Sequence, residues 1–436
     1  MGSATAVFSS AILLVASVCL AQGLHLNPDE QRAIVEKTLK LVSDNYVFPE
    51  RVKDIESALT VNLRAGKYNS LVALDEFLAA LNYDMQSAGR DRHLRIVSNP
   101  RIVSQLKQEA MGSAESSPLF LKMLRENNFR LRKAESLDGN IGYFKLDNFV
   151  ELRHVKDALV GAMNFLSHSS GLILDLTDNG GGASETADFL LSYFLPEGTI
   201  TGESWSRASG RWTVSKVARM PEARPMYETP LYILVSERTA SAAEAVAYTL
   251  QQAKRAVVAG SRTRGMANAG VQLIINDRLF VIVPTMRNIN AVTRRNWEGV
   301  GVEPDIPVEP GKAMPAAMAN ALKLLAEQRT DRKEKFALLF LAAEYESILA
   351  PETPAAGLLN LCAGEYEGGR KIELRSGVLY FIQGAAARRL TYMKEHTFLV
   401  EGRRDYRLRF HLEDGKASSL EVLWNDGSSD TYGRTR

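Results

Sequence analysis

The sequence predicts an α/β protein with a small helical domain at its N-terminus and a small antiparallel β domain at its C-terminus. Three observations indicate this fold class. Apolar residues recur at helical spacing from residue 27 to about 97, and apolar strand-like runs alternate with helix-like segments from 141 to 260. Short strand-like runs separated by turn residues fill the chain after residue 363. Strands that are apolar on both faces and alternate with helices are typical of a sheet with much parallel pairing.

Residues 1–21 are predicted to be a signal peptide. Residues 6–21 read AVFSSAILLVASVCLA, an apolar run that spans about 24 Å as a helix. That length is short of the roughly 30 Å hydrocarbon core of a bilayer, and small residues precede an expected cleavage after Ala21. We therefore expect an exported chain, periplasmic or secreted. An uncleaved membrane anchor, or a lipid attached to Cys19, is the alternative that the sequence leaves open.

Residues 22–97 are expected to form the N-terminal helical domain. Pro28, followed by Asp29 and Glu30, favours a helix start. Proline suits the first turn of a helix, and acidic side chains stabilise the positive end of its dipole. The helical spacing ends in a short strand-like run at 91–97.

Residues 98–328 are expected to form the α/β core. A polar stretch with one helix at 118–124 comes first, and strands and helices then alternate. The predicted strands are 141–147, 171–176, 231–236 and 255–260, and the predicted helices are 154–165, 184–194, 242–253 and 313–327. The runs VQLII and LFVIV flank Asn276-Asp277, which predicts a hairpin.

The last part of the chain is expected to hold a helical linker at 329–355 and a β domain at 356–436. Pro351 and Pro354 lie close to the boundary between them. Turn residues recur every ten or so positions after it, as in a small antiparallel sheet or barrel. No candidate site is identified in this β domain.

The composition limits the classes of function. Lys and Arg number 53 and Asp and Glu number 51, so the formal charge is only +2. This balance gives no basic excess for a nucleic-acid partner. Of the two cysteines, Cys19 lies in the predicted signal peptide, so a chain without that segment cannot form an internal disulfide. The histidines show no metal-ligand spacing, and we predict neither a metal site nor a cofactor.

Ser241 stands where a predicted strand turns into a predicted helix. A hydroxyl at this place lies near backbone N–H groups that can hold a developing oxyanion, as a nucleophilic serine requires. A serine there is also a common helix N-cap, so the spacing alone leaves both interpretations open. The residues around it do not form the Gly-x-Ser-x-Gly turn of the α/β-hydrolases.

A glycine-rich loop, 180–182, follows the predicted strand at 171–176. Glycines allow a close backbone approach and can turn their N–H groups toward an anion. The alternatives are a phosphate cradle and a flexible turn. No Gly-Lys-Ser/Thr or Gly-x-Gly-x-x-Gly pattern accompanies the loop, which disfavours nucleotide binding.

Two further residues are candidates for acid–base chemistry. His93 lies at the junction of two predicted domains, and Glu298 lies in a loop that contains Trp297 and two glycines. A carboxylate in a shaped, partly buried loop can orient a base or carry a shifted pKa. Taken alone, each residue is equally compatible with a structural or surface role.

Four segments, taken in order, resemble the tail-specific (C-terminal processing) serine peptidases, particularly the branch that resembles interphotoreceptor retinoid-binding protein and the tricorn protease core. The segments are NIGYFKLDNF, GLILDLTDNGGG, ERTASAAEAVAYTLQQAKRAVVAGSRTRG and WEGVGVEPDIPV. The resemblance covers about residues 28–325. It implies an α/β catalytic core of the crotonase/ClpP type without the usual PDZ insert, because 98–138 is too short to hold one.

The resemblance assigns a role to each candidate. The family's nucleophile falls on Ser241. The position of the Lys base of the better-known members holds Met266, which cannot accept a proton, so a Ser–Lys dyad is excluded. The tricorn-like arrangement implies His93 as the base and Glu298 as the supporting carboxylate. Arg92 stands where tricorn-type sites have a serine before the histidine.

The same resemblance places the oxyanion donors. They would be the backbone N–H groups of Gly180 or Gly181 and of Ala242. The arginine that is usual in the loop motif is replaced by Thr177.

The function expected from the sequence is an exported serine peptidase that cleaves peptide bonds near polypeptide C-termini. Its expected partners are peptide or unfolded-protein C-termini, with no nucleic acid, and a membrane only through the N-terminal segment. The alternative is a non-catalytic binding protein for apolar ligands or peptides on the same fold.

Overall fold

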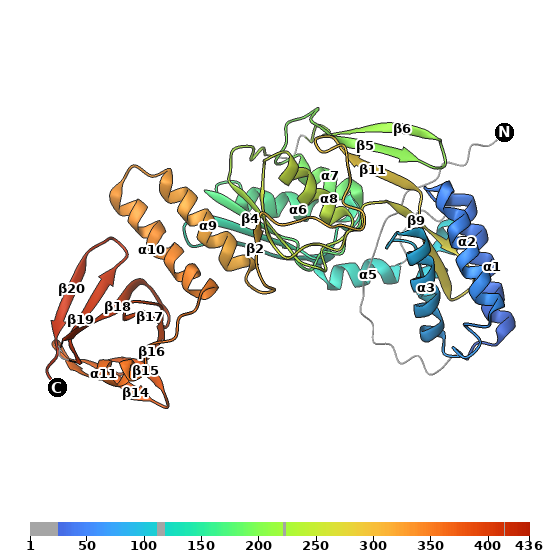
Figure 1. Ribbon diagram of the computed structural model, residues 1–436. Helices are drawn as coiled ribbons and strands as arrows, with labels where there is room; N and C mark the ends of the chain where they lie inside the picture. The colour runs from blue at the N-terminus through green and yellow to red at the C-terminus, as the bar shows by residue number, and fades with distance from the viewer. Residues whose placement is uncertain (1–24, 111–117, 221–223, 414) are drawn as a thin grey trace. The chain divides into compact units, whose positions relative to one another are not determined.

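A computed structural model describes residues 25–110, 118–220, 224–413 and 415–436. The chain divides into two compact units (Figure 1). The first comprises the chain up to residue 135 with 143–168 and 172–307, and the second comprises 136–142, 169–171 and 308–436. The predicted signal peptide lies outside the described residues. None of the helices in the described residues has the length and apolar character needed to cross a membrane.

Three helices open the first unit, and they are coloured blue in Figure 1. They are α1 (Pro28–Asn45), α2 (Pro49–Arg64) and α3 (Leu74–Gly89). The first begins where the sequence predicts. The Asn27 side chain accepts the Glu30 N–H at 3.0 Å, and the Glu30 carboxylate accepts the Asn27 N–H at 2.9 Å. This reciprocal capping box satisfies two N–H groups that a helix start leaves without partners.

The N-terminal helices share a hydrophobic core with a sheet that comes mostly from a later part of the chain. The strands β1 (Arg95–Ser98), β10 (Leu279–Pro284) and β9 (Gly270–Ile274) pair in that order, all antiparallel. The predicted hairpin is therefore present, and its apolar side chains pack against the helices. The pairing of β1 with β10 fixes the segment that carries His93 against this core.

The centre of the first unit is a six-stranded sheet with the strand order β12-β8-β7-β4-β3-β2. The pairs β4–β7, β7–β8 and β8–β12 are parallel, and every residue of β4 and β7 is buried. The strands are β2 (Leu131–Leu137), β3 (Ile141–Leu146), β4 (Gly171–Asp175), β7 (Leu231–Val235), β8 (Val257–Gly260) and β12 (Ile306–Pro307). The connecting helices are α6 (Leu152–Leu166), α7 (Ser184–Leu191) and α8 (Ala242–Gln252). This sheet confirms the predicted α/β class.

Several elements of the first unit are absent from the sequence prediction. Residues 98–138 were expected to hold one helix, but they contain α4 (Pro100–Ala110), α5 (Pro118–Glu126), a 3₁₀ turn at 128–130 and β2. A separate antiparallel sheet has the order β11-β5-β6, and its strands are β5 (Ile200–Ser206), β6 (Arg211–Lys216) and β11 (Met286–Asn290). The strand β6 is almost entirely exposed and the other two are mostly half-buried and polar, so no apolar alternation marks this sheet in the sequence.

The second unit contains two long helices and an eight-stranded antiparallel sheet. Helix α9 (Ala313–Glu327) has the predicted bounds, but it clusters with this unit and not with the core in which the sequence analysis placed it. Helix α10 (Arg332–Leu349) occupies the predicted linker. Asp331 caps its first turn by accepting the N–H groups of Lys333 and Glu334 at 2.9 Å each.

The eight strands form a nearly closed barrel, as predicted for residues 356–436. Each strand pairs with the next, and the short helix α11 (Leu358–Cys362) precedes them. A bridge between Tyr366 and Arg434 joins the first strand to the end of the chain. The strands are β13 (Gly364–Tyr366), β14 (Arg370–Arg375), β15 (Val378–Gln383), β16 (Ala386–Tyr392), β17 (Thr397–Val400), β18 (Arg403–Glu413), β19 (Lys416–Trp424) and β20 (Ser429–Gly433). Cys362 is a buried free thiol.

Candidate active site

Ser241 occupies a strained turn between β7 and α8. Its backbone has φ 55° and ψ −120°, a conformation that L-residues rarely adopt. Such outliers cost about 1–3 kcal/mol and persist where the surrounding structure enforces them, often at active sites. Here the Ser241 N–H donates to Glu244 Oε2 at 2.8 Å, and the helix begins directly after the serine. The backbone of the serine is thus held at the start of α8 by a specific hydrogen bond.

Glu244 joins this turn to the segment at 263–266. The Glu244 side chain is fully buried, and its Oε1 accepts the Thr263 hydroxyl and the Gly265 N–H, while Oε2 also accepts the Met266 N–H at 2.8 Å. Burial raises the pKa of Glu244, against the lowering effect of these hydrogen bonds. The sequence analysis did not identify Glu244 as part of the site. Its signal was the pattern Ser-x-x-Glu at a helix start, which is a capping box.

The glycine-rich loop lies directly against the Ser241 turn. Gly181 has φ 104°, and a Cβ atom placed on it would lie 2.7 Å from Ser241 Cβ and 2.9 Å from the Ala240 carbonyl oxygen. The Ala240 N–H donates to the carbonyl of Asn179 at 3.1 Å. Glycine is therefore required for the two backbones to approach, as the sequence analysis expected of this loop.

The predicted oxyanion donors differ in whether their N–H groups already have a hydrogen-bond acceptor. The Gly181 N–H donates to Asn179 Oδ1 at 2.9 Å, so it is already engaged within the loop. No acceptor among the described residues engages the N–H of Gly180 or of Ala242. A Cβ on Gly181 would also lie 3.2 Å from the Ala242 nitrogen, which places that nitrogen against the loop. Of the predicted donors, Gly180 and Ala242 are the two whose N–H groups are free for a ligand.

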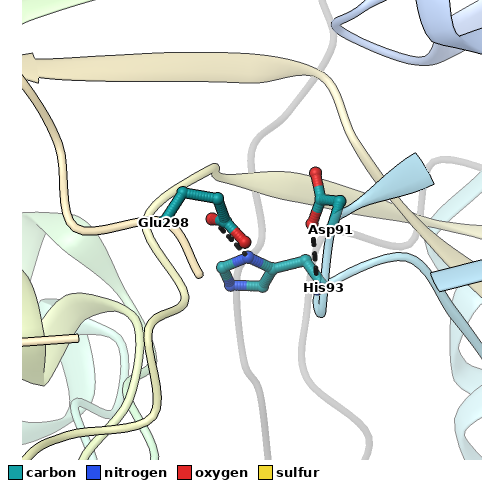
Figure 2. A group of neighbouring side chains, drawn as sticks. All are labelled: Asp91, His93 and Glu298. Carbon is teal, nitrogen blue, oxygen red and sulfur yellow. Dashed lines mark hydrogen bonds and ion pairs between the residues drawn. The ribbon is translucent and has the colours of Figure 1, made fainter. Parts of the chain in front are cut away.

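The side chains of His93 and Glu298 lie next to each other (Figure 2). The His93 side chain is 2% exposed, and its Nδ1 lies 3.6 Å from Glu298 Oε2. The N–H groups of Ala267 and Asn268 donate to the same oxygen at 2.7 and 3.0 Å. Burial acts to raise the pKa of Glu298, but His93 and these two N–H groups outweigh it and hold that pKa below its ordinary value. Glu298 is therefore ionised beside the imidazole at neutral pH.

A second carboxylate, Asp91, lies on the other side of His93 (Figure 2). Its Oδ1 accepts the His93 N–H at 3.0 Å, and its Oδ2 accepts the Tyr46 hydroxyl at 3.2 Å and the Asn268 amide at 3.5 Å. Burial and the charge of Glu298 raise the pKa of Asp91 to about 6, against the opposing effect of His93. The position of Asp91 two residues before His93 was its only signal in the sequence, and Tyr46 and Asn268 gave none.

The segment at 266–267 connects the Ser241 turn to the carboxylate beside His93. Consecutive N–H groups of Met266 and Ala267 donate to Glu244 and to Glu298, respectively. A second connection runs through Arg264, whose N–H donates to the Thr239 carbonyl at 3.1 Å. The Arg264 carbonyl in turn accepts from Arg92 Nη1 at 2.9 Å. The nucleophile and base candidates therefore belong to one neighbourhood, although about 150 residues separate them in the sequence.

A direct hydrogen bond between Ser241 and His93 is not formed. Both ring nitrogens of His93 are buried and lack a hydrogen-bond partner among the described residues. Catalytic hydrogen bonds are often long before substrate binds and tighten in the substrate complex. The pairing of the two residues therefore stays a prediction, as do the roles of Glu298 and the oxyanion donors.

Asp91, His93 and Glu298 are also the residues in the described part of the chain that could hold a metal ion. One ligand atom from each lies within 4.8 Å of the other two. Hydrogen bonds from Tyr46, Asn268 and backbone N–H groups already orient both carboxylates. The same arrangement of an imidazole between two carboxylates is also suited to acid–base chemistry.

Two family models match the chain. Residues 140–308 match the model of peptidase family S41, and residues 23–131 match the model described as the N-terminal domain of peptidase S41 in eukaryotic IRBP. The first match contains the Ser241 turn and Glu298, and the second contains His93. The chain belongs to peptidase family S41.

Curated relatives agree with this S41 assignment. The chloroplastic carboxyl-terminal-processing peptidase 1 of Arabidopsis thaliana is 27% identical over 241 residues, which cover 53% of this chain and 47% of the relative. The carboxyl-terminal-processing protease of Synechocystis is 25% identical over 242 residues, which cover 54% of each protein. The chain thus spans about half the length of the curated relatives it matches. The tricorn protease structure shows a weak likeness, with a TM-score of 0.38, 14% identity and coverage of 73% of this chain and 37% of that one.

Met266 distinguishes this S41 site from a Ser–Lys site. The Met266 side chain is 3% exposed, and its backbone carbonyl accepts the Trp297 indole N–H at 3.3 Å. A thioether cannot act as a base, whereas the neutral imidazole of His93 has a ring nitrogen that can accept a proton.

Proposed function

We propose that the chain is a serine peptidase in which Ser241 is the nucleophile and His93 is the general base. The observation that carries the proposal is the shared segment at 266–267. It donates one N–H to the carboxylate that holds the Ser241 turn and the next N–H to the carboxylate beside His93. This shared segment supports a pairing of the two residues, because nucleophilic catalysis requires a serine and a base near each other.

The proposed reaction follows the chemistry of acyl transfer. As Ser241 Oγ attacks the carbonyl carbon of the peptide bond, its proton passes to His93, and Glu298 stabilises the imidazolium that forms. The N–H groups of Gly180 and Ala242 hold the oxyanion of the tetrahedral intermediate. His93 then gives its proton to the leaving amine. In the second half, His93 takes a proton from a water molecule that attacks the acyl carbon, and it returns this proton to Ser241 Oγ as the ester bond breaks.

The proposed substrates are polypeptides cleaved near their C-termini. The relatives named above are carboxyl-terminal-processing peptidases, and this name supports the same substrate class for the present chain. We propose in addition that the chain is exported, because the apolar run at 6–21 has the length and composition of a signal peptide.

The test is covalent labelling of the serine. A chain starting at residue 22 is incubated with a peptidyl phosphonate that reacts with activated serines, and the labelled peptide is mapped by mass spectrometry. We expect label on Ser241, loss of label in Ser241→Ala, and a strong decrease in His93→Gln. Ser261→Ala is the matched control, since its hydroxyl donates to Glu237 at 3.2 Å and has no role in the mechanism. A folded chain without label at Ser241 would overturn the proposal.

A binding protein without catalysis is the second candidate, and the observation that favours it is Met266 in place of a lysine base. A cavity lined by Leu26, Ile34, Leu74 and Leu279 lies beside the N-terminal helices, with a volume of about 170 Å³. Sites for drug-sized ligands usually have about 300–1,000 Å³, so this cavity is small for a fatty acid or a retinoid. Binding of a fluorescent fatty acid that persists in Ser241→Ala, without turnover of unstructured peptides, would favour this second candidate.

A further inference from the structure

Two arginines flank the proposed catalytic pair. Arg264 lies in the loop after β8, and its N–H donates to the carbonyl of Thr239, two residues before Ser241. Arg95 begins β1, two residues after His93. The two guanidinium groups are therefore carried by the same two segments that carry the nucleophile and the base.

Neither guanidinium is neutralised by the described part of the chain. Arg95 and Arg264 are half-buried, no carboxylate among the described residues pairs with either, and the buried Nε of Arg95 has no hydrogen-bond partner. The neighbouring arginines behave differently, because Arg238 pairs with Asp178 at 2.6 Å and Arg262 pairs with Glu303 at 2.5 Å. Arg95 and Arg264 thus carry unbalanced positive charge, as does the exposed Arg92 beside them.

The two groups also lie close enough to act on each other. Burial lowers the pKa of Arg95, and the charge of Arg264 lowers it further. Two half-buried cations that repel each other are stabilised when an anion binds between them. Arg92, which donates to the Arg264 carbonyl, ties the loop of one cation to the segment of the other.

The chemistry of the groups identifies the anion. A guanidinium presents N–H donors in a planar fork that matches the two oxygens of a carboxylate. We propose that Arg95 and Arg264 form a carboxylate-binding subsite beside Ser241, and that its ligand is the terminal carboxylate of the polypeptide substrate. This inference rests on the proposed function, which it deepens by assigning the residues that would direct cleavage to chain ends.

The test measures binding separately from cleavage. The full chain with Ser241→Ala is titrated into three peptides that carry a fluorophore at the N-terminus and have otherwise uncharged side chains. The first ends in a free carboxylate, the second ends in a carboxamide, and the third ends in a carboxamide after an internal Asp. We expect the free acid to bind roughly 10- to 100-fold more tightly than the carboxamide, as for one charge-assisted bidentate contact.

Variants assign the preference to the two arginines. Adding Arg264→Gln or Arg95→Gln separately to the Ser241→Ala chain is expected to reduce the preference for the free acid to about threefold or less. The carboxamide peptide should bind these variants as it binds the parent. Arg101→Gln is the matched control, because this exposed arginine at the start of α4 carries the same charge outside the pair. Thermal unfolding of each variant checks that it is folded, and either arginine variant alone suffices for the test.

Three outcomes would overturn the proposal: no preference for the free acid in the parent, a preference that both arginine variants retain, or equal binding of the peptide with an internal Asp. The last would assign the subsite to side-chain carboxylates. The phosphonate experiment reports on the proposed function independently. If binding of the free acid depends on the arginines but the phosphonate does not label Ser241, the subsite is supported and the peptidase function is rejected. If the phosphonate labels Ser241 but the free acid is not preferred, the peptidase function is supported and the subsite is rejected.

Discussion

His93 lies between two buried carboxylates whose pKa values are shifted in opposite directions. The pKa of Glu298 is lowered, since His93 and two backbone N–H groups outweigh its burial, whereas burial and Glu298 raise the pKa of Asp91 to about 6. Pairs of titratable groups whose environments separate their pKa values are typical of active sites. The two carboxylates therefore allow separate predictions, one for activity and one for stability.

Removing the charge of Glu298 should impair catalysis more than folding. Glu298→Gln keeps the size of the side chain and an oxygen that can accept the N–H groups of Ala267 and Asn268, but it no longer stabilises an imidazolium at His93. We expect kcat/KM for an unstructured peptide to fall by roughly 10²- to 10⁴-fold, the range typical of general acid–base assistance. Steady-state kinetics on the variant and the parent measure the change. An unchanged kcat/KM would remove Glu298 from the mechanism.

Asp91 should make the stability of the chain depend on pH. Its folded-state pKa of about 6 lies above its ordinary value, so the folded chain holds the proton more tightly than the unfolded chain does. The stability that this proton provides is full below about pH 4 and is lost as the pH rises through about 6.

Asp91→Asn removes this ionisation. Relative to the parent, the variant should gain free energy of unfolding between pH 4 and pH 8, by up to about 3 kcal/mol. Urea unfolding at both pH values measures the difference. The constant cost of replacing the acceptor of the Tyr46 and Asn268 hydrogen bonds cancels in this comparison between two pH values. Stability curves that run parallel with pH would contradict the prediction.

The Ser241 turn and the glycine-rich loop are two elements that depend on each other's shape. Gly181→Ala would bring a methyl group to 2.7 Å from Ser241 Cβ at a φ that disfavours a side chain. We expect a loss of about 1–3 kcal/mol in the free energy of unfolding and at least a tenfold slower phosphonate labelling of Ser241.

Gly161→Ala is the control for this prediction. Gly161 lies in α6, and no atom lies within 4 Å of a Cβ placed on it. Alanine favours a helix over glycine by about 0.5–1 kcal/mol, so this variant should be at least as stable as the parent and labelled at the same rate. Equal labelling rates in the two alanine variants would show that the close approach of the loop does not matter for the nucleophile.

At the scale of whole elements, the sequence predicts what local patterns encode. Apolar patterns predicted the alternating strands and helices of the central sheet, and Pro28 with its acidic neighbours predicted the start of α1. The structure confirms both. The sheet of β5, β6 and β11 gave no signal, because β6 is almost entirely exposed and β11, which pairs with β5, begins about 80 residues after β5 ends. The helix α4 was not predicted either, although its apolar residues pack on the β9–β10 hairpin.

The candidate site was predicted to the extent that a family resemblance could place it. Local patterns made Ser241, His93 and Glu298 candidates and the resemblance assigned their roles, and in the structure His93 and Glu298 lie side by side. Tyr46 and Asn268 could not be predicted, since each contributes through a tertiary contact with Asp91 that no local pattern encodes. Glu244 could have been predicted from the sequence, because it follows Ser241 by three residues, as the acidic residue of a capping box does.

For the molecule as a whole, the second compact unit carries its own stabilising interactions. The barrel has a continuous hydrophobic core that includes Phe381, Phe398 and Leu408. Helix α10 belongs to the same unit, and the buried Arg407 connects it to the barrel. Its guanidinium lies 3.7 Å from the centre of the Phe340 ring and donates to the Phe340 carbonyl. Burial lowers the pKa of Arg407 to about 10, so the charge is retained at neutral pH.

These contacts predict that a fragment of residues 329–436 folds alone and that one of residues 356–436 is less stable. Without α10, Arg407 loses both the carbonyl acceptor and the aromatic ring, which together correspond to roughly 2–4 kcal/mol of unfolding free energy. Urea unfolding can be followed through Trp424, the only tryptophan in either fragment. In the longer fragment Arg407→Met should remove most of the difference, whereas Arg375→Met, at an exposed position of β14, should not. Equal stabilities of the two fragments would show that the barrel does not depend on α10.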